Sequence, residues 1–499
     1  MLKPAHRLIH QRVAMRAAES PDATALVFQG KRISYAVLNA AADSCAAELA
    51  RRGAGSGVIV PVMLPRSPVL VLSLLAILKT GAAYSAFDSR WPEGRKNALL
   101  RLLDSPVVIG QPRDIPGVFD PTIRSLPEWA ALGGRPPVSP DDPAMPAAVF
   151  FTSGTTGEPK GVVSPHQATT RLFDSEGPMA FGPKQVMTQA SSPAWDAFNL
   201  ELWGMLTTGG TAVITDHDFL VPGVLRRLIA DEGVTTAWLG ASLFNLFIDT
   251  SPGVFSGLQS LFIGGERVSV GHVREFLACY PGVQLLNGYG PVETCVFATC
   301  HPISATDLDL PGGIPLGRPV PGTGIVLVDG EICVSGSGLA SGYLGQPRLT
   351  AERFGEELVD GTPTRVYRTG DLGALDAGGV LHFRGRADRQ VKIRGYRIEP
   401  AEIEAAAGSL PGVAWCVTVP VPGPEPGTFR ELALFYQASH LGPDRAPDPA
   451  RMRRLLGDLL PGYALPGLIR EVTEIPVTLN GKADTAALLG GLADGKVSR

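Results

Sequence analysis

A loop rich in glycine and hydroxyl side chains is the stretch whose composition points most directly to chemistry. Residues 149–163 read VFFTSGTTGEPKGVV, in which an apolar run gives way to small polar residues and a lysine. Glycines let backbone N–H groups turn toward one point, and hydroxyls add donors with little bulk, so the loop predicts an anion-binding nest. The candidate phosphate ligands are Thr152, Ser153, Gly154, Thr155, Thr156, Gly157 and Lys160. The spacing does not fit G-x-x-x-x-G-K-[ST], and a polar surface turn is the structural alternative.

Two further stretches place a carboxylate beside glycines. Residues 287–294 (NGYGPVET) contain Glu293, and residues 367–371 (YRTGD) end in Asp371. One carboxylate with both oxygens free can accept from two neighbouring hydroxyls, so Asp371 is a candidate ribose ligand. Without other motifs, each carboxylate would be interpreted as an ordinary turn residue. A third glycine cluster, residues 335–342, lacks the dinucleotide-binding spacing and predicts a turn.

Composition limits the class of protein. A chain of 499 residues is too long for one core and predicts two or more domains. A net charge of −4 argues against nucleic acid or an anionic membrane as the main partner. Six scattered cysteines without a C-x-x-C pair favour reduced thiols in a cytoplasmic protein. The N-terminus has no apolar signal-peptide core, and no apolar run is long enough to span a bilayer.

The elements that must position these motifs alternate between helix and strand. Residues 33–52 carry apolar side chains at helical spacing, residues 58–64 predict a buried strand, and residues 68–78 predict the next helix. Residues 107–109 predict a further strand, and residues 113–145, rich in proline and glycine, predict a loop. This alternation favours an α/β fold with a wound parallel sheet.

A domain boundary is expected near residues 385–390, where short charged residues separate two strand-like runs. Beyond it, residues 402–407 and 451–460 predict helices, and residues 413–421 predict a strand. The tail is large enough to fold as a small α/β domain. We therefore expect a core of residues 1–387 and a C-terminal domain of residues 388–499.

Taken together, these stretches resemble the adenylate-forming superfamily of acyl-CoA synthetases, luciferases and nonribosomal peptide synthetase adenylation domains. Residues 149–163, 287–294, 367–371 and 479–484 match its motifs in the family's order, so the resemblance covers nearly the whole chain. It implies a large N-terminal core with wound sheets and a small β-barrel-like part, followed by a mobile C-terminal domain. Residues 85–89 (SAFDS) depart from the family's usual Val-Pro-Leu-Asp-Pro run.

The resemblance also implies roles for individual residues. The co-substrate is ATP, and Mg²⁺ is expected at Glu293. Asp388 matches the hinge about which the small domain rotates, and Lys482 matches the catalytic lysine that contacts the substrate carboxylate and the α-phosphate. Phe383 stands where the family often has a tyrosine. The remaining nucleotide-binding positions are Gly265, Glu266, Asn287, Gly288, Tyr289, Gly290, Asp371 and Arg386.

Residues 193–204 resemble the substrate-pocket helix of amino-acid-activating members, in which the residue at Asp196 pairs with the α-ammonium. A buried cation needs a matching anion, although Asp196 could also simply cap the helix. The carried-over pocket is otherwise apolar or glycine, apart from Lys482, and the bulk of Trp238 and Phe297 predicts a small aliphatic substrate. The set resembles that of valine-activating members, with Phe262 and Val296 as departures, so valine is the first candidate. 2-Aminobutyrate and isoleucine are close behind, because a methylene is worth only about 1–3 kcal/mol of discrimination. The pocket set is Asp196, Ala197, Leu200, Trp238, Phe262, Gly264, Gly288, Val296 and Phe297, closed by Lys482.

The expected reaction forms an aminoacyl-AMP and then transfers the acyl group to the phosphopantetheine thiol of a separate carrier protein. No carrier or condensation motif occurs in the sequence, which favours a free-standing adenylation protein. The family's small activator protein is a further candidate partner. An acyl- or aryl-CoA ligase is the main alternative, and a nucleotide-binding module without catalysis is the third.

Lys482→Ala provides the first test of these assignments. We expect adenylate formation to fall about 100- to 1000-fold, because a preorganised cation is lost where charge develops. Transfer of a pre-formed adenylate to a thiol should continue nearly normally. Pyrophosphate exchange and single-turnover loading measure the two steps separately, and equal losses in both would contradict the assigned role.

Overall fold

The computed structural model describes residues 8–111, 118–152, 159–174, 179, 181–217, 219–251, 253–423, 427–438, 446–477 and 483–493. The chain falls into two compact units. The first comprises Met1–Ser89, Leu103–Phe151 and Gly161–Ala387, and the second comprises Arg90–Leu102, Thr152–Lys160 and Asp388–Arg499. The predicted α/β class, with a large N-terminal and a smaller C-terminal part, is confirmed.

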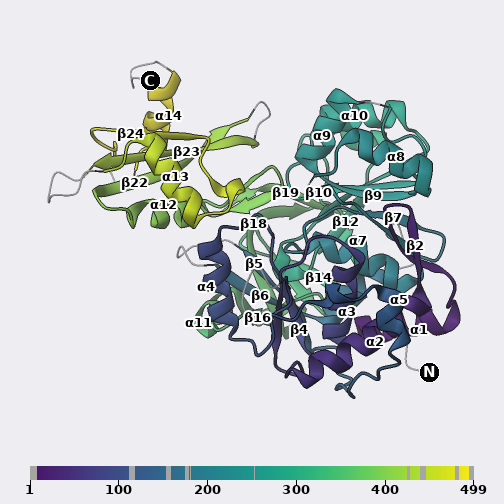
Figure 1. Ribbon diagram of the computed structural model, residues 1–499. Coiled ribbons are helices and arrows are strands. Elements are labelled where there is room, and N and C mark those ends of the chain that lie inside the picture. Colours follow the sequence, from purple (N-terminus) through teal and green to yellow (C-terminus); the bar gives the residue numbers. More distant parts are fainter. Residues whose placement is uncertain are drawn as a thin grey trace. The chain divides into compact units, whose positions relative to one another are not determined.

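A nine-stranded sheet forms one layer of the first unit (Figure 1). Its six central strands run parallel, and the edge strands are antiparallel. Helices α8 (Pro222–Glu232), α9 (Ala241–Thr250) and α10 (Val270–Cys279) lie beside β9 and β10 and bury an apolar core against the sheet. In spatial order the strands are β13 (Arg318–Pro319), β12 (Thr299–Pro302), β11 (Gln284–Tyr289), β10 (Ser260–Gly264), β9 (Thr236–Gly240), β7 (Val186–Gln189), β8 (Thr211–Ile214), β1 (Thr24–Phe28) and β2 (Lys31–Ser34).

A second sheet has five strands, and helices pack between and around these sheets to form the largest core. Helix α2 forms where the spacing of apolar residues predicts a helix. Ser34 caps its first turn by accepting from Val37 N–H at 3.3 Å, and its periodic apolar residues are buried. The strands are β16 (Gly342–Tyr343), β6 (Lys160–Pro165), β5 (Pro146–Thr152), β4 (Ala83–Ala86) and β3 (Ile59–Val62); the helices are α1 (Ile9–Glu19), α2 (Tyr35–Arg51), α3 (Pro68–Lys79) and α7 (Ala197–Thr208).

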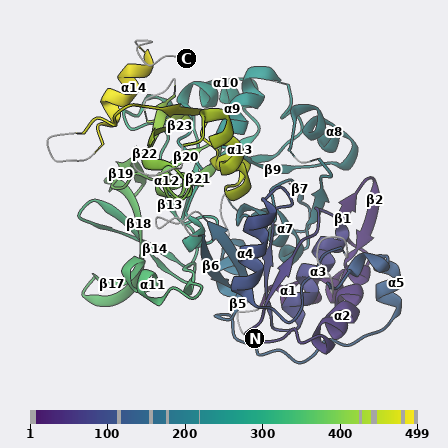
Figure 2. The same cartoon turned by 60° about the vertical axis from the view of Figure 1, so that its left-hand side comes forward.

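The third sheet of this unit is antiparallel and corresponds to the expected small β-rich part (Figure 2). Its long strand β18 carries the ribose motif, and β19 pairs with it so that Asp371 lies opposite Arg386. Helix α11 (Pro347–Arg353) lies beside β17 (Figure 2). The strands are β14 (Thr323–Val328), β15 (Glu331–Gly336), β17 (Phe354–Val359), β18 (Thr362–Leu375) and β19 (Leu381–Arg386).

The second unit is built on a three-stranded sheet of β22 (Val413–Pro422), β23 (Phe429–Ala438) and β24 (Leu468–Glu471), with the small pair β20 (Val391–Ile393) and β21 (Tyr396–Ile398). Side chains of β23 alternate between two cores: Leu432, Leu434 and Tyr436 pack with helices α12 (Pro400–Gly408) and α13 (Pro449–Leu459), and the intervening residues pack with α14 (Thr485–Ala493). Helix α4 (Glu93–Leu103) also contributes to this unit.

Two expectations about local structure were wrong. Residues 113–145 are not simply a loop, because η2 (Pro121–Ile123) and helix α5 (Leu126–Ala131) lie within them. Ser125 and Glu128 form a capping box at the start of α5, whose six residues are too few for a periodic signal. Residues 107–109 form only isolated bridges through Ile109 rather than a strand.

Candidate active site

The parallel register of β9, β10 and β11 gathers the predicted pocket positions. Phe262 on β10 is aligned with Trp238 on β9, and Gly264 is aligned with Gly288 on β11. Gly264 ends β10 and Gly288 lies one residue before the end of β11, while Trp238 and Phe262 lie in the middle of β9 and β10. The two glycines are therefore at the carboxyl ends of neighbouring parallel strands, which is where open α/β sheets bind their ligands.

Aromatic rings fill one side of this pocket. The Phe297 ring lies 6.3 Å from that of Phe262 and 5.5 Å from that of Trp238, measured between centroids. A further ring, Phe181, stacks on Phe262 at 5.8 Å and 11°. Phe181 belongs to no motif and was missed at the sequence level, because nothing local links residue 181 to strand β10.

Gly288 is required by this packing. A Cβ atom added there would lie 2.2 Å from Cε1 of Phe297, so the ring rests directly on the glycine backbone. Phe262, Phe297 and Leu200 are almost completely buried, whereas Ala197 and Trp238 remain partly exposed. Of these five positions, the two that remain accessible therefore present apolar side chains.

Asp196 lies at the start of α7, but its side chain does not cap that helix. Its Oδ2 instead accepts a hydrogen bond from the Val296 N–H at 2.8 Å. Burial raises the pKa of Asp196 to about 6, the Val296 N–H counteracts this, and the nearby charge of Glu293 raises the pKa further. The charged carboxylate is thus costly where it stands, and a ligand cation would offset that cost.

A buried chain of hydrogen bonds fixes α7. Tyr84 Oη donates to Asn199 Oδ1 at 2.9 Å and accepts from Trp203 Nε1 at 2.9 Å, and Asn199 Nδ2 donates to Thr169 Oγ1 at 3.3 Å. Both Asn199 and Trp203 belong to α7, so this chain sets the position of the helix that begins beside Asp196.

Residues 85–89, which differ from the family's usual run, contact the segment that precedes Asp196. Asp88 accepts a hydrogen bond from Ser192 Oγ at 2.9 Å, four residues before Asp196. Ser85 Oγ donates to the Val149 carbonyl at 3.0 Å. The carboxylate in this run therefore anchors the segment that leads into the substrate helix.

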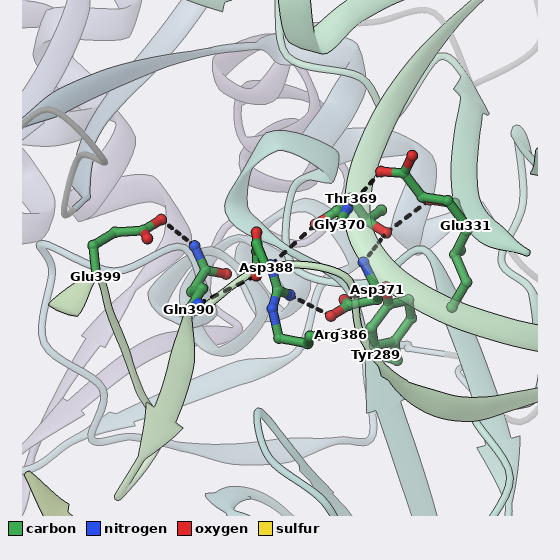
Figure 3. A network of polar contacts seen from close by, with 10 residues as sticks. Tyr289, Glu331, Thr369, Gly370, Asp371, Arg386, Asp388, Gln390 and Glu399 are labelled. Atoms are coloured by element: carbon green, nitrogen blue, oxygen red, sulfur yellow. Dashed lines mark hydrogen bonds and ion pairs between the residues drawn. The ribbon is translucent and has the colours of Figure 1, made fainter. Parts of the chain in front are cut away.

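The predicted ribose ligand lies in a polar network (Figure 3). Tyr289 Oη donates to Asp371 Oδ2 at 2.6 Å, and Arg386 Nη1 donates to Asp371 Oδ1. The expectation that both oxygens of Asp371 are free was therefore wrong, although each oxygen keeps a further acceptor site for a hydroxyl. Burial, and then the charge of Asp371, raise the pKa of Tyr289 well above its ordinary value, so the phenol remains a donor.

Glu293 on η4 (Val292–Thr294) is fully buried, and its Oε1 accepts from Tyr343 Oη at 2.9 Å. Its backbone carbonyl accepts from the Ala340 N–H at 2.8 Å. No cluster of three or more potential metal ligands occurs among the described residues. A single oriented carboxylate nevertheless fits Mg²⁺, which is commonly held by one or two carboxylates together with phosphate oxygens.

The phosphate loop is only partly described. Ser153, Gly154, Thr155, Thr156 and Gly157 lie outside the described residues, as does Lys482. Thr152 is buried, and its hydroxyl has no hydrogen-bond partner among the described residues, so a phosphate oxygen could satisfy it.

Lys160 belongs to the second unit, where its ammonium lies 3.9 Å from a carboxylate oxygen of Glu399. Gln390 Nε2 donates to Glu399, and the Gln390 N–H donates to Asp388 at 3.2 Å (Figure 3). The predicted hinge residue therefore holds the local turn at the start of this unit, and its role in rotation remains a prediction.

The other nucleotide positions are held mainly by protein contacts. Glu266 accepts from Ser242 Oγ at 2.7 Å, and Asn287 Nδ2 donates to the Pro315 carbonyl at 2.7 Å. A Cβ atom at Gly290 would lie 2.6 Å from the Val296 carbonyl oxygen, so that glycine permits a close backbone approach. Gly265 follows β10 with a φ of +81°, and Phe383 lies on β19 opposite Gly373.

Among the residues that the structure describes, none of the helices combines the length and apolar character that crossing a bilayer requires. All six cysteines are unpaired, in agreement with the expectation of free thiols.

Comparison with known proteins identifies relatives along nearly the whole chain. Residues 13–344 match the family model described as AMP-binding enzyme. The chain is 32% identical to tyrocidine synthase 3 of Brevibacillus parabrevis over 97% of its length, and 31% identical to bacitracin synthase 1 of Bacillus licheniformis over 97%. It spans only 8% and 9% of those two proteins.

A solved structure gives similar agreement. Holo-PA1221, described as a protein containing adenylation and PCP domains bound to a vinylsulfonamide inhibitor, is 32% identical with a TM-score of 0.86. The match covers 97% of this chain and 84% of that one.

Gly288→Ala tests the packing of the pocket. We expect the free energy of unfolding to fall by about 1–3 kcal/mol, since a methyl group is forced into the Phe297 ring. Gly355→Ala is the matched control, because a Cβ there meets no atom within 4 Å. Denaturant titrations measure both variants, and the double variant Gly288→Ala/Phe297→Leu should recover part of the loss. Equal stability of the two single variants would contradict the contact.

Proposed function

Because the chain belongs to the AMP-binding enzyme family, and is therefore an AMP-forming ligase, we propose that it activates a small aliphatic amino acid. The aminoacyl-AMP would then react with the phosphopantetheine thiol of a carrier protein. The observation that carries this proposal is the Asp196 carboxylate, which is held by the Val296 N–H at 2.8 Å and costly to charge without a cation. An α-ammonium supplies that cation, whereas fatty and aryl acids that lack an amine do not.

The lining supports a small, uncharged side chain. Trp238, Phe262 and Phe297 form a packed aromatic wall, and Ala197, next to Asp196, is partly exposed. Apart from Asp196, no described member of the pocket set carries a charge that would pair with a charged side chain. Valine is the first candidate, with 2-aminobutyrate and isoleucine as close competitors.

In the first half-reaction a carboxylate oxygen of the amino acid attacks the α-phosphorus of ATP, and pyrophosphate leaves with the electrons of the broken P–O bond. Asp371 and Tyr289 would orient the ribose, and Lys482 would stabilise the charge on the α-phosphate oxygens. Glu293 would hold Mg²⁺, which when bound neutralises phosphate charge.

In the second half-reaction a thiolate attacks the carbonyl carbon, and AMP leaves. The carrier-protein acceptor is supported by the PCP domain in the solved relative and by the synthase relatives. An acyl- or aryl-CoA ligase remains the alternative, and it would use an acid without an amine and free coenzyme A.

Asp196→Ala tests the amine assignment. We expect kcat/KM for the preferred amino acid to fall at least about 30-fold, because the ammonium is left without its buried partner. The corresponding acid without the amine should become the better substrate of the variant. ATP–pyrophosphate exchange across the amino acids and their deaminated analogues measures both effects. Wild-type activity confined to benzoates or long-chain acids would overturn the proposed function.

The acid limb of the pH profile provides an independent test. Asp196 must be ionised to bind the ammonium, and burial raises its pKa to about 6 in the free enzyme. We therefore expect kcat/KM for the amino acid to be constant above this pH and to fall about tenfold per unit below it. Exchange rates between pH 5 and 8 measure the limb, and Asp196→Ala with the deaminated acid is the control that should lack it. The same limb in that control would assign it to another group.

A further inference from the structure

A buried arginine outside every predicted motif holds the turn that faces Asp196. Arg171 begins η3 (Arg171–Phe173), directly after α6 (His166–Thr170), and is 4% exposed. Its Nη2 donates to the Thr294 carbonyl at 2.7 Å and to the Phe297 carbonyl at 2.8 Å. One nitrogen therefore joins the two ends of the four-residue turn 294–297.

This turn requires such support. Cys295 and Val296 have φ values of +51° and +63°, in the left-handed region that residues with a Cβ rarely adopt. Backbone of this kind persists only when its surroundings over-determine it. Val296 is also the residue whose N–H binds the Asp196 carboxylate, at 2.8 Å, so the strained turn delivers the donor that orients Asp196.

Among the described residues, the guanidinium of Arg171 donates hydrogen bonds only to this turn. Its Nε and Nη1 are buried without hydrogen-bond partners among the described residues, and burial lowers its pKa to about 10. Burying a cation in this way is unfavourable unless it is strongly bound, and the two turn carbonyls accept from its Nη2. The two carbonyls of the turn are therefore the contacts that offset the burial of the Arg171 cation.

The glycine cluster at residues 335–342 makes room for the side chain. A Cβ atom at Gly338 would lie 2.1 Å from Nε of Arg171. In the same cluster, the Ala340 N–H donates to the Glu293 carbonyl at 2.8 Å, immediately before the turn. The cluster therefore admits the guanidinium and supports the turn from its other side.

A second side chain of the same segment also reaches the turn. Thr169 Oγ1 lies 3.4 Å from Cys295 Sγ and accepts from Asn199 on α7. Residues 169 and 171 thus connect the substrate helix to the turn through buried contacts.

We propose that Arg171 is a positioning residue for amine recognition: it clamps the 294–297 turn so that the Val296 N–H holds the Asp196 carboxylate toward the substrate ammonium. The inference rests on the proposed function. It assigns the specificity of the pocket partly to a residue that touches neither substrate nor nucleotide.

Arg171→Gln removes both carbonyl contacts. We expect the KM for the preferred amino acid to rise at least about tenfold, the loss expected for hydrogen bonds to a charged group. The Kd for a non-hydrolysable ATP analogue, measured by calorimetry, should change less than about threefold, because the nucleotide residues are not displaced. Arg171→Lys should restore KM to within about threefold of wild type, since a single ammonium can donate to both carbonyls as Nη2 does.

Gly338→Ala displaces the guanidinium without altering it, and Gly355→Ala is its matched control. We expect Gly338→Ala to reproduce the selective rise in amino-acid KM and Gly355→Ala to leave it unchanged. Thermal unfolding shows whether each variant is folded. If Arg171→Gln does not fold, Gly338→Ala and Arg171→Lys provide the test instead. Parallel weakening of amino-acid and nucleotide binding, or a lower melting temperature with unchanged KM, would overturn the positioning role.

These outcomes are separable from failure of the proposed function. Wild type with no amino-acid-dependent exchange would refute the function itself. Wild-type exchange that is lost in Asp196→Ala, with Arg171→Gln unaffected, would refute only the role of Arg171.

Discussion

The hydrogen bond between the Val296 N–H and the Asp196 carboxylate is the contact on which the candidate site depends. Removing a carboxylate from water is unfavourable, and backbone N–H donors, that of Val296 first among them, offset only part of the cost. In the proposed function the ammonium of the substrate would supply the positive partner that this carboxylate lacks. The geometry of that donor in turn depends on a strained turn, since Val296 has a φ of +63°.

Much of the surrounding structure serves to hold these two groups in place. Tyr84, Asn199 and Trp203 fix the helix that begins beside Asp196, while Arg171 and Thr169 fix the turn. Buried polar networks of this kind specify one geometry because each unsatisfied member would be costly. In the proposed function the aromatic wall would limit the size of the substrate side chain, and the absence of a Cβ at Gly288 lets the Phe297 ring pack against the backbone there.

In the nucleotide region the sequence identified individual residues but not the contacts between them. The sequence named Asp371 and Arg386 as nucleotide-binding positions, and the pairing of β18 with β19 places them opposite each other. The expectation of two free oxygens on Asp371 failed because Tyr289 and Arg386 both bind it. Those partners lie 82 and 15 residues away, and no local pattern pairs a tyrosine on β11 with an aspartate on β18. Helix α5 was missed for a different reason: six residues are too few to display a periodicity.

By itself, the sequence determined the α/β class and the order of the nucleotide motifs, and it predicted an acidic residue in an otherwise apolar pocket, because these depend on residue types and short spacings. Only the tertiary structure decided that Phe181 backs the pocket wall, that Asp196 binds a backbone N–H rather than capping α7, and that Arg171 clamps the opposite turn. The physical reason is that parallel strand register and buried hydrogen bonds join residues across long stretches of chain. Such contacts follow from how elements pack, which local composition does not encode.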